Sequence, residues 1–267
     1  MTGGSGGGGG PPPVRPFPRE VLAADTFAAA RALIGARLVR DGADGEPRIG
    51  RIVEVEAYLG EEDRASHARM GPTARNRVMF GPPGLAYVYL VYGHVCANVV
   101  TGPDGVAAAV LLRSVVPLEG AQAMRAARAE RAIAYRRRDR ENPEAAASRL
   151  ARVPDARLAV GPANLAAAFG VERSDNGVDL LDPASALRLE LPPEGEPPVA
   201  FVATPRIGVE HAGPGWADKP WRFVDPEAVR RVAVGRDRGR PGTPGALRSE
   251  GPGPEREASG EQDEGAQ

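Results

Sequence analysis

The alternation of apolar and polar side chains is clearest between Arg51 and Gly60, and it predicts a β-strand there. Alternate residues of a strand face opposite sides, so one side would be apolar and the other would carry two carboxylates and a tyrosine. The apolar set is Val53, Val55 and Ala57, and the polar set is Glu54, Glu56 and Tyr58. The polar side is either a solvent-exposed edge or one wall of a catalytic cleft, and this pattern leaves both interpretations open.

Three further hydrophobic runs predict two consecutive hairpins. Leu85–Tyr92 is rich in Val and Tyr, which favour extended backbone, and Val95–Val100 follows across a turn at Gly93-His94. A second turn at residues 102–105 leads into Val106–Arg113. Neighbouring strands joined by hairpins indicate an antiparallel sheet. Shorter strands are predicted at Arg37–Arg40, Leu180, Leu187–Leu191, Phe201–Val209 and Trp221–Val224.

Helical periodicity occurs on both sides of these strands. An apolar stripe predicts a helix over Arg19–Gly35, with Asp25 capping its main part. Further helices are predicted at Leu118–Arg138, Asn142–Leu150 and Asn164–Phe169. Residues 60–83 form a polar loop, too long to be without function in a compact domain. The predicted fold class is α+β: a single mixed domain with a curved antiparallel sheet, a protruding β-hairpin and surrounding helices.

Composition separates this domain from two tails. Residues 1–16 and 236–267 are rich in Gly and Pro, which predicts disorder and leaves a domain over residues 17–235. Six acidic residues against two arginines give residues 241–267 a net charge of −4, so residues 1–240 carry +3 of the total of −1. A mildly basic domain is compatible with nucleic-acid contact but does not require it.

Cysteine and histidine usage argues against a metal site or a disulfide framework. Cys96 is the one cysteine, and His67, His94 and His211 show no known metal-ligand spacing, so neither metal nor cofactor is expected. No run is long and apolar enough to span a membrane, and no signal-peptide pattern is present, so a cytoplasmic protein is expected.

Several polar residues stand out against apolar surroundings. Tyr87 and Tyr89 either pack across strands or form a stacking surface, and Tyr92 is either one more packing aromatic or an exposed wedge at the hairpin tip. Asn98 and Arg113, each within an apolar strand, are either structural or part of a site.

Arginines provide candidates for phosphate contacts. Arg75 and Arg77 lie in the long loop, where binding residues are often found, and His94 lies beside the hairpin tip. The run at residues 136–138 is more typical of a solvated helix end than of a phosphate clamp.

Short motifs in one order, over about residues 19–224, resemble the alkyladenine (3-methyladenine) DNA glycosylase family, of the mammalian type that also occurs in bacteria. The motifs are Glu54-Val-Glu-Ala-Tyr-Leu-Gly60, His67, Arg75-Asn-Arg77, Met79-Phe80, Tyr87-Val-Tyr89, Tyr92-Gly93, Asn98, Leu111-Leu-Arg-Ser114, Pro117-Leu-Glu-Gly120, Gly161-Pro162, Arg206-Ile-Gly-Val209 and Lys219-Pro-Trp-Arg-Phe223.

This resemblance implies an enzyme that flips damaged purines out of duplex DNA and hydrolyses their N-glycosidic bond. It implies that Glu56 activates the attacking water, which Arg113 and the backbone of Val209 help to hold. It further implies that Tyr92 fills the gap left in the base stack. The residues that would form the base pocket are Tyr58, His67, Tyr89 and Asn98.

Lys219 is the only lysine and is far in sequence from the strand that carries Glu56. This predicts a monofunctional enzyme without a Schiff-base step.

A monomer acting on double-stranded DNA with damaged purines is expected. Two rival interpretations are a lesion-binding protein without catalysis and a nucleosidase acting on free nucleosides. Glu56 and Arg113 argue against the first rival, and a wedge at Tyr92 would have no use in the second.

Overall fold

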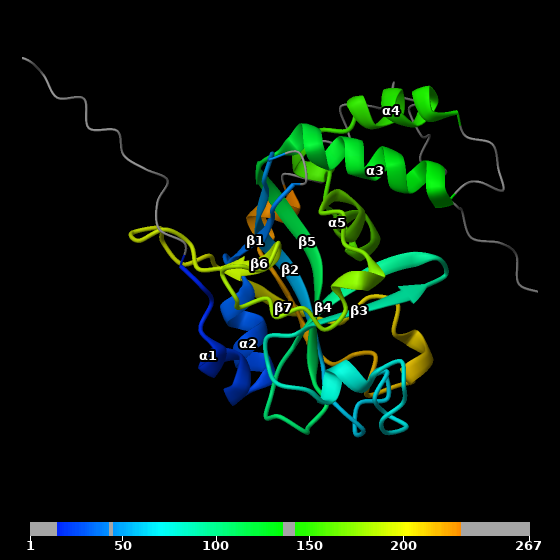
Figure 1. The fold of residues 1–267 in the computed structure, drawn as a ribbon. Helices are drawn as coiled ribbons and strands as arrows, with labels where there is room; N and C mark the ends of the chain where they lie inside the picture. The colour runs from blue at the N-terminus through cyan, green and yellow to red at the C-terminus, as the bar shows by residue number, and fades with distance from the viewer. Residues whose placement is uncertain (1–14, 43–44, 136–141, 231–267) are drawn as a thin grey trace, which may run out of the picture.

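One antiparallel sheet and the helices around it make up the part of the chain that the structure describes. The structure, a computed structural model, describes residues 15–42, 45–135 and 142–230 of the 267-residue chain (Figure 1). The predicted tails lie largely outside these residues. At the end of the first tail, Arg15 donates a hydrogen bond to the carbonyl of Pro192 and Pro16 forms a bridge with Glu190, so the described body begins slightly before residue 17.

The sheet has eight antiparallel strands and is not closed, in agreement with the predicted α+β class. Six strands follow the order β3-β4-β5-β2-β1-β6, while β8 pairs with β2 and β7 pairs with β8. The strands are β1 (Arg37–Arg40), β2 (Arg48–Tyr58), β3 (Ala86–Val91), β4 (His94–Val100), β5 (Ala109–Glu119), β6 (Leu187–Glu190), β7 (Val202–Thr204) and β8 (Arg222–Val224). The predicted hairpin, β3–β4, projects beyond the rest of the sheet, and β5 curves along its length (Figure 1).

Strand β2 is the centre of this arrangement. It pairs with β5 along one edge, and its other edge is shared by two shorter strands. Residues 48–51 pair with β1, and residues 54–56 pair with β8. Because β1 covers only the first half of β2, the second half accepts β8 and brings Arg222 beside Glu56.

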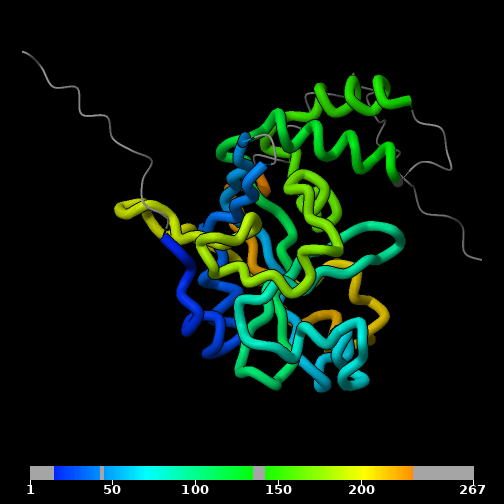
Figure 2. Tube along the Cα trace, in the orientation of Figure 1, coloured from blue at the N-terminus to red at the C-terminus, as the bar shows by residue number. Residues whose placement is uncertain are grey.

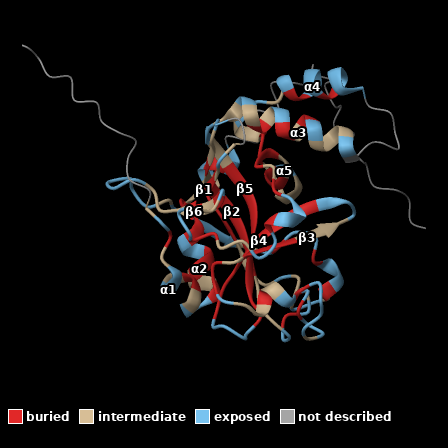
Figure 3. Ribbon diagram, viewed as in Figure 1, coloured by how far each residue is buried: buried red, intermediate tan, exposed pale blue. Residues whose placement is uncertain are grey.

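Helices cover the sheet at two places. Helix α2 packs on β2 and β5, and α5 packs on β4 and β5, while α3 and α4 pack on each other farther out (Figure 2). The helices are α1 (Arg19–Ala24), α2 (Thr26–Leu33), α3 (Ala121–Tyr135), α4 (Pro143–Ala151) and α5 (Pro162–Ala168). Burial is concentrated on β2, β5 and α5, whereas the outer sides of α3 and α4 are exposed (Figure 3).

The single helix predicted over Arg19–Gly35 is wrong, because the chain contains two helices. Asp25 has an extended backbone, with φ of −156° and ψ of 134°, and this interrupts the helix. Its carboxylate accepts a hydrogen bond from the backbone N–H of Ala28 at 2.7 Å, so Asp25 caps α2 as predicted. In a continuous helix, the N–H of Ala28 would instead donate to the backbone carbonyl four residues earlier.

Strand β5 also differs from its predicted range. It begins at Ala109 rather than at Val106, which is exposed, and it continues to Glu119. The following helix therefore begins at Ala121, and the last residues of the predicted helix, up to Arg138, lie outside the described residues. Gly120 separates the two elements with a φ of 75°, and a Cβ there would lie 2.2 Å from the carbonyl oxygen of Pro47, so glycine is required.

Two other predicted strands are shorter or missing. Only residues 202–204 of the predicted strand Phe201–Val209 pair with a neighbour, and Leu180 lies in a turn. The hairpin turn consists of Tyr92 and Gly93 rather than Gly93 and His94, since β3 ends at Val91 and β4 begins at His94.

Candidate active site

The polar face of β2 is buried, which excludes the solvent-exposed edge. Glu54 is 7% exposed and Glu56 is 0% exposed. An ionised carboxylate is stable in such a place only when hydrogen bonds and opposite charges compensate the lost hydration. Both carboxylates have such partners, and the partners differ.

Glu56 is held by groups that come from three separate segments. Its Oε1 accepts a hydrogen bond from the backbone N–H of Ile207 at 2.8 Å. Its Oε2 accepts one from the Tyr58 hydroxyl at 2.8 Å and lies 3.1 Å from Nη1 of Arg113. Burial, and then the charge of Glu56, raise the pKa of Tyr58, so this hydroxyl stays protonated and remains a donor.

Glu54 accepts three hydrogen bonds and fixes Arg113 from the other side. Its Oε1 lies 3.0 Å from Nε of Arg113 and 2.8 Å from Nη1 of Arg222, and its Oε2 lies 2.5 Å from the Ser114 hydroxyl. Burial raises the pKa of Glu54, but the Ser114 hydrogen bond and the charge of Arg113 outweigh it and leave the pKa below the ordinary value. One guanidinium therefore bridges two buried carboxylates, so Arg113 has a structural part as well as a place in the site.

A buried ion pair supports the segment that holds Glu56. Arg206 forms a two-pronged pair with Asp63, at 2.6 and 3.0 Å, and both side chains are 0% exposed. Its guanidinium lies 4.6 Å from the ring centroid of Tyr58 and 4.8 Å from that of Trp221. Because Arg206 directly precedes Ile207, this pair fixes the N–H that reaches Glu56.

A cavity of about 320 Å³ opens next to this carboxylate. Glu56 is not among the residues that line the cavity, but two of its hydrogen-bonding and ion-pair partners, Tyr58 and Arg113, are. The carboxylate therefore lies directly behind the lining. The other predicted site residues that line it are His67, Tyr89, Tyr92, Asn98 and Val209. The structure thus brings together the predicted base pocket, the predicted wedge and the partners of the carboxylate.

The aromatic side of the cavity is held by ring contacts. The rings of His67 and Tyr89 meet edge-on, with centroids 4.3 Å apart, and Nδ1 of His67 lies 3.1 Å from the Tyr87 hydroxyl. Partial burial, and then the charge of Arg75, lower the pKa of His67, which favours the neutral imidazole. The cavity therefore presents neutral aromatic faces and edges, which suit a planar base.

The cavity lining also includes two residues with fixed polar groups: Asn98, whose function the sequence pattern left open, and Val209, which only the family resemblance indicated. The Asn98 side chain is buried and donates to the carbonyl of Tyr87 at 2.8 Å, so its amide orientation is set by the backbone of the neighbouring strand. The carbonyl of Val209 accepts a hydrogen bond from the N–H of Ala212 at 2.9 Å, and a carbonyl has a second lone pair for another donor.

Tyr92 occupies the hairpin tip with a left-handed backbone. Its φ is 47°, the following Gly93 has a φ of 82°, and Tyr92 is 90% exposed. Two consecutive residues with positive φ match the tight hairpin turns that suit the twist of antiparallel strands. Such a backbone at a non-glycine residue costs about 1–3 kcal/mol and is found mainly at functional sites.

The three predicted DNA-backbone contacts lie outside the lining of this cavity. Arg75 donates to the carbonyl of Leu90 at 2.7 Å, so it ties the long loop to β3. Arg77 is exposed at the start of a short 3₁₀ helix, and His94 is exposed at the start of β4. Neighbouring Asn76 is buried and donates to the carbonyl of His67 at 2.9 Å, which anchors the loop next to the cavity.

Asp63, Arg206 and Ser114 are positioning residues whose contacts sequence patterns did not reveal. Arg206 and Ser114 belong to motifs that carry the family resemblance, but nothing in the spacing indicates that they contact Asp63 and Glu54, respectively. Within the described residues, no group of three His, Cys, Asp or Glu side chains could hold a metal ion. No helix of the described part is long and apolar enough to cross a membrane.

Comparison with known proteins identifies the class of this site. Residues 20–228 match the sequence profile of the methylpurine-DNA glycosylase family. Enzymes of this class cleave the bond between a base and its deoxyribose, and the aromatic cavity beside a buried carboxylate is compatible with such a reaction.

Individual relatives agree with this match. A protein of Anaeromyxobacter dehalogenans named as a 3-methyladenine DNA glycosylase is 44% identical over 210 residues, covering 78% of this chain and 82% of the relative. Proteins of the same name in Methanocella arvoryzae and Nocardia farcinica are 44% and 43% identical, and the alignments cover 91% and 94% of them. The chain belongs to the methylpurine-DNA glycosylase family and is an N-glycosylase of DNA repair, as its motifs predicted.

Proposed function

We propose that this enzyme excises damaged purines, alkylated or deaminated, from duplex DNA with a water molecule activated by Glu56. The observation that carries the proposal is the fully buried Glu56 carboxylate, held by Tyr58, Arg113 and the N–H of Ile207 directly behind an aromatic cavity. The names of the relatives, which refer to 3-methyladenine, support an alkylated purine as one substrate.

In the proposed reaction, the damaged nucleotide leaves the base stack and its base enters the cavity. Extrusion costs a few kcal/mol and is easiest where pairing is already weak, which favours lesions over normal pairs. Tyr58, His67 and Tyr89 would contact the base, and base–aromatic stacking returns about 1–3 kcal/mol per base. Tyr92, on the exposed hairpin tip, would occupy the space that the base leaves.

Hydrolysis then requires a water molecule at C1′ of the extruded sugar. The carboxylate of Glu56 would take a proton from this water while the water oxygen bonds to C1′ and the C1′–N bond breaks, its electron pair leaving with the base. Arg113 and the second lone pair of the Val209 carbonyl would hold the water. A carboxylate has about four lone-pair sites, so the three contacts of Glu56 leave room for this hydrogen bond.

The charge of Glu56 would also act on the sugar. Cleavage passes through an oxocarbenium-like state, which an adjacent preorganised carboxylate stabilises. A cationic base such as 3-methyladenine leaves readily, whereas a neutral base such as hypoxanthine needs a proton from an acid. The lesion range therefore depends on how the cavity supplies that proton.

A monofunctional reaction is supported by the position of Lys219. Its Nζ lies 4.5 Å from the ring centroid of Trp216 and 4.7 Å from that of Trp221, and Lys219 is not among the residues that line the cavity. An amine held between two aromatic rings is poorly placed to attack C1′ of a base bound in the cavity. Water is thus the proposed nucleophile.

The test is release of free base, under single-turnover conditions, from duplexes containing 3-methyladenine, 7-methylguanine, hypoxanthine or ethenoadenine. Release from at least one lesion, with an intact abasic strand, is expected. Binding without any release would favour a lesion-binding protein, and equal activity on free nucleosides would favour a nucleosidase. A covalent protein–DNA adduct trapped with borohydride would contradict the water mechanism.

A further inference from the structure

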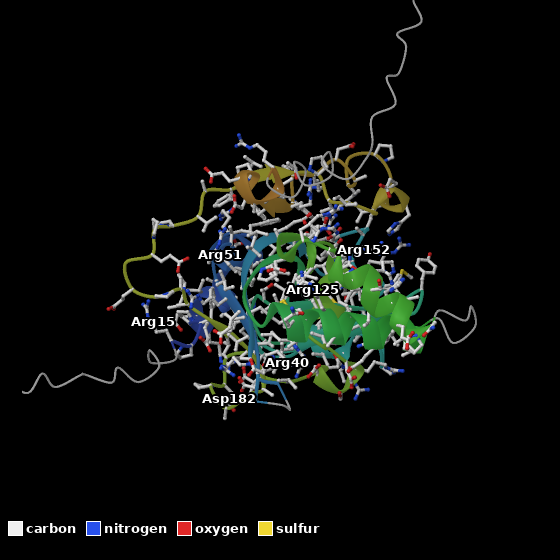
Figure 4. The ribbon with its side chains drawn as sticks, turned by 90° about the horizontal axis from the view of Figure 1, so that it is seen from above. Arg15, Arg40, Arg51, Arg125, Arg152 and Asp182 are labelled. Atoms are coloured by element: carbon white, nitrogen blue, oxygen red, sulfur yellow. The ribbon has the colours of Figure 1, made fainter. Side chains whose placement is uncertain are left out.

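His211 lines the active-site cavity but makes none of the contacts that hold Glu56. It belongs to a short 3₁₀ helix, Glu210–Ala212, that follows directly after Val209, and it is exposed. The segment of residues 205–218 lies at the surface, on the side of the molecule away from Arg40 (Figure 4). His211 can therefore exchange protons with solvent while its side chain borders the space that would receive the base.

The backbone that carries His211 is fixed by hydrogen bonds. The carbonyl of Val209 accepts one from the N–H of Ala212 at 2.9 Å, and the carbonyl of Glu210 accepts one from the N–H of Gly213 at 3.1 Å. Four residues before His211, the N–H of Ile207 donates to the Glu56 carboxylate at 2.8 Å. One short, ordered segment thus connects the proposed base to a histidine at the cavity.

Four other ionisable groups that line the cavity are poorly matched to proton donation near neutral pH. Burial raises the pKa of Tyr58 and of Tyr89 above the ordinary tyrosine value, and it raises the pKa of Tyr87 to about 12. Burial also raises the pKa of the Cys96 thiol. An efficient general acid has a pKa near the working pH, so none of these groups is suited to the task.

Two more groups of the lining are unsuited for different reasons. Burial lowers the pKa of Arg113, but the charges of Glu56 and then Glu54 outweigh it and leave the pKa above the ordinary value, so the guanidinium keeps its proton. Tyr92 is exposed at the hairpin tip, where its proposed place is in the base stack.

His67 is the other histidine of the lining, and its surroundings favour the neutral ring. Burial, then the charge of Arg75 and then that of His211, lower the pKa of His67. Its Nδ1 also lies 3.1 Å from the Tyr87 hydroxyl. The influence of His211 on His67 is consistent with two imidazoles that border the same space, of which His211 is the better placed to carry a proton.

We propose that His211 donates a proton to the leaving base when the enzyme excises a neutral damaged purine such as hypoxanthine. This inference rests on the proposed function, in which Glu56 activates a water molecule at C1′. Histidine gains and loses its proton near neutral pH and is the side chain that most often serves as a general acid. A positively charged base leaves without such a proton, so His211 affects which lesions are excised rather than whether excision occurs.

In the proposed step, two side chains move protons. The N–H proton of the His211 imidazolium goes to a ring nitrogen of the base, while the C1′–N bond breaks and its electron pair stays with the base. The water oxygen bonds to C1′, and a proton of this water goes to Glu56. Neutral His211 then takes a proton from solvent and Glu56 releases one, which restores both groups.

Single-turnover base release from two matched duplexes provides the test. One duplex contains hypoxanthine and the other contains 7-methylguanine, whose positively charged base leaves without an added proton. His211→Gln should release hypoxanthine about 10²-fold more slowly, within the usual range for general acid catalysis, while its release of 7-methylguanine stays close to that of the wild type. An effect on the fold or on DNA binding would slow both reactions.

The pH dependence gives a second readout. A general acid must be protonated, so hypoxanthine release by the wild type should fall as pH rises through the pKa of the donor. The same fall should be absent from 7-methylguanine release, and His211→Gln should lose it for hypoxanthine.

Glu210→Gln is the matched control, because it removes a charge from the same 3₁₀ helix at an exposed position outside the cavity lining. Both of its release rates should stay close to those of the wild type. Equal losses on the two lesions in His211→Gln, an unchanged hypoxanthine rate, or a wild type that releases 7-methylguanine but no hypoxanthine would overturn the proposal. Absence of release from every lesion by the wild type would instead contradict the proposed function, and with it this inference.

Discussion

Around Glu56, polar groups from several segments hold one another in fixed positions, whereas at the tip of the β3–β4 hairpin Tyr92 projects into solvent on a left-handed backbone. The carboxylate region is built from β2, β5, β8 and residues 206–209, so its geometry exists before DNA arrives. Preorganised charges of this kind stabilise developing charge without further rearrangement. The hairpin tip must instead remain accessible, because Tyr92 is proposed to enter the base stack of the DNA.

The two regions also differ in where stability is lost. The fold tolerates two buried carboxylates beside one arginine only while each charge keeps its hydrogen-bond and ion-pair partners. At the tip, a strained backbone costs about 1–3 kcal/mol and is compensated elsewhere in the fold. Substitutions in the carboxylate region should therefore change both stability and activity, and substitutions at the tip should change DNA binding with little loss of stability.

The largest effect on stability is expected for Arg113→Leu. This change leaves Glu54 and Glu56 buried without the cation that bridges them, and breaking a buried ion pair costs about 3–5 kcal/mol. Urea denaturation measures the loss. Arg31→Leu, which removes an exposed ion pair with Asp25, is the control and should cost no more than about 1 kcal/mol. Similar losses for the two variants would contradict the bridging function of Arg113.

Tyr92→Ser should weaken DNA binding without a matching loss of stability. Removal of the aromatic ring takes away stacking that contributes about 1–3 kcal/mol per base. Affinity for a duplex with an abasic analogue is the appropriate measurement, because the gap in the stack is already present. An unchanged dissociation constant in this assay would count against the wedge.

Tyr92→Gly separates strain from binding at the same position. Glycine adopts a φ of 47° at little cost, so the free energy of unfolding of Tyr92→Gly should exceed that of Tyr92→Ser by about 1–2 kcal/mol. The two variants should bind DNA equally weakly. Thermal unfolding of the two variants side by side measures the difference. A glycine variant no more stable than the serine variant would show that the tip carries no strain.

The smallest effect concerns pH. The folded-state pKa of Glu54 lies below the ordinary value of 4.5, so its ionised form stabilises the fold above that pH and the contribution is lost as pH falls through the folded-state pKa. Glu54→Gln should therefore be destabilising at about pH 7 and less so at about pH 3.5. Denaturation at both values tests this, and an equal loss at both would mean that the charge of Glu54 does not contribute.

Local patterns predicted those parts of the molecule that depend on local geometry. The alternation in residues 51–60 located β2, and the tyrosine-rich run located the hairpin. The sequence of this strand could not decide between a solvent-exposed edge and one wall of a catalytic cleft, because the answer depends on which residues pack against Glu54 and Glu56. Their partners Ser114 and Ile207 lie 60 and 151 residues away.

Other features were missed for similar physical reasons. Asp63 and Arg206 are 143 residues apart, and nothing in either local sequence indicates that they pair. The backbone of Tyr92 is determined by the twist of two strands rather than by the preference of tyrosine, so the turn was predicted one residue too late. The helix break at Asp25 was missed because the apolar stripe continues on both sides of this capping residue, so the pattern resembles that of a single helix.

Glu56→Gln provides the most direct test of the proposed chemistry, because glutamine keeps the shape of the side chain but cannot accept a proton from water. Base release under single-turnover conditions should fall by about 10²- to 10⁴-fold, the usual contribution of general-base catalysis, while affinity for the lesion duplex stays close to that of the wild type. Glu61→Gln, at an exposed position of the neighbouring loop, is the control. Release by Glu56→Gln at the wild-type rate would contradict the assignment of Glu56 as the base.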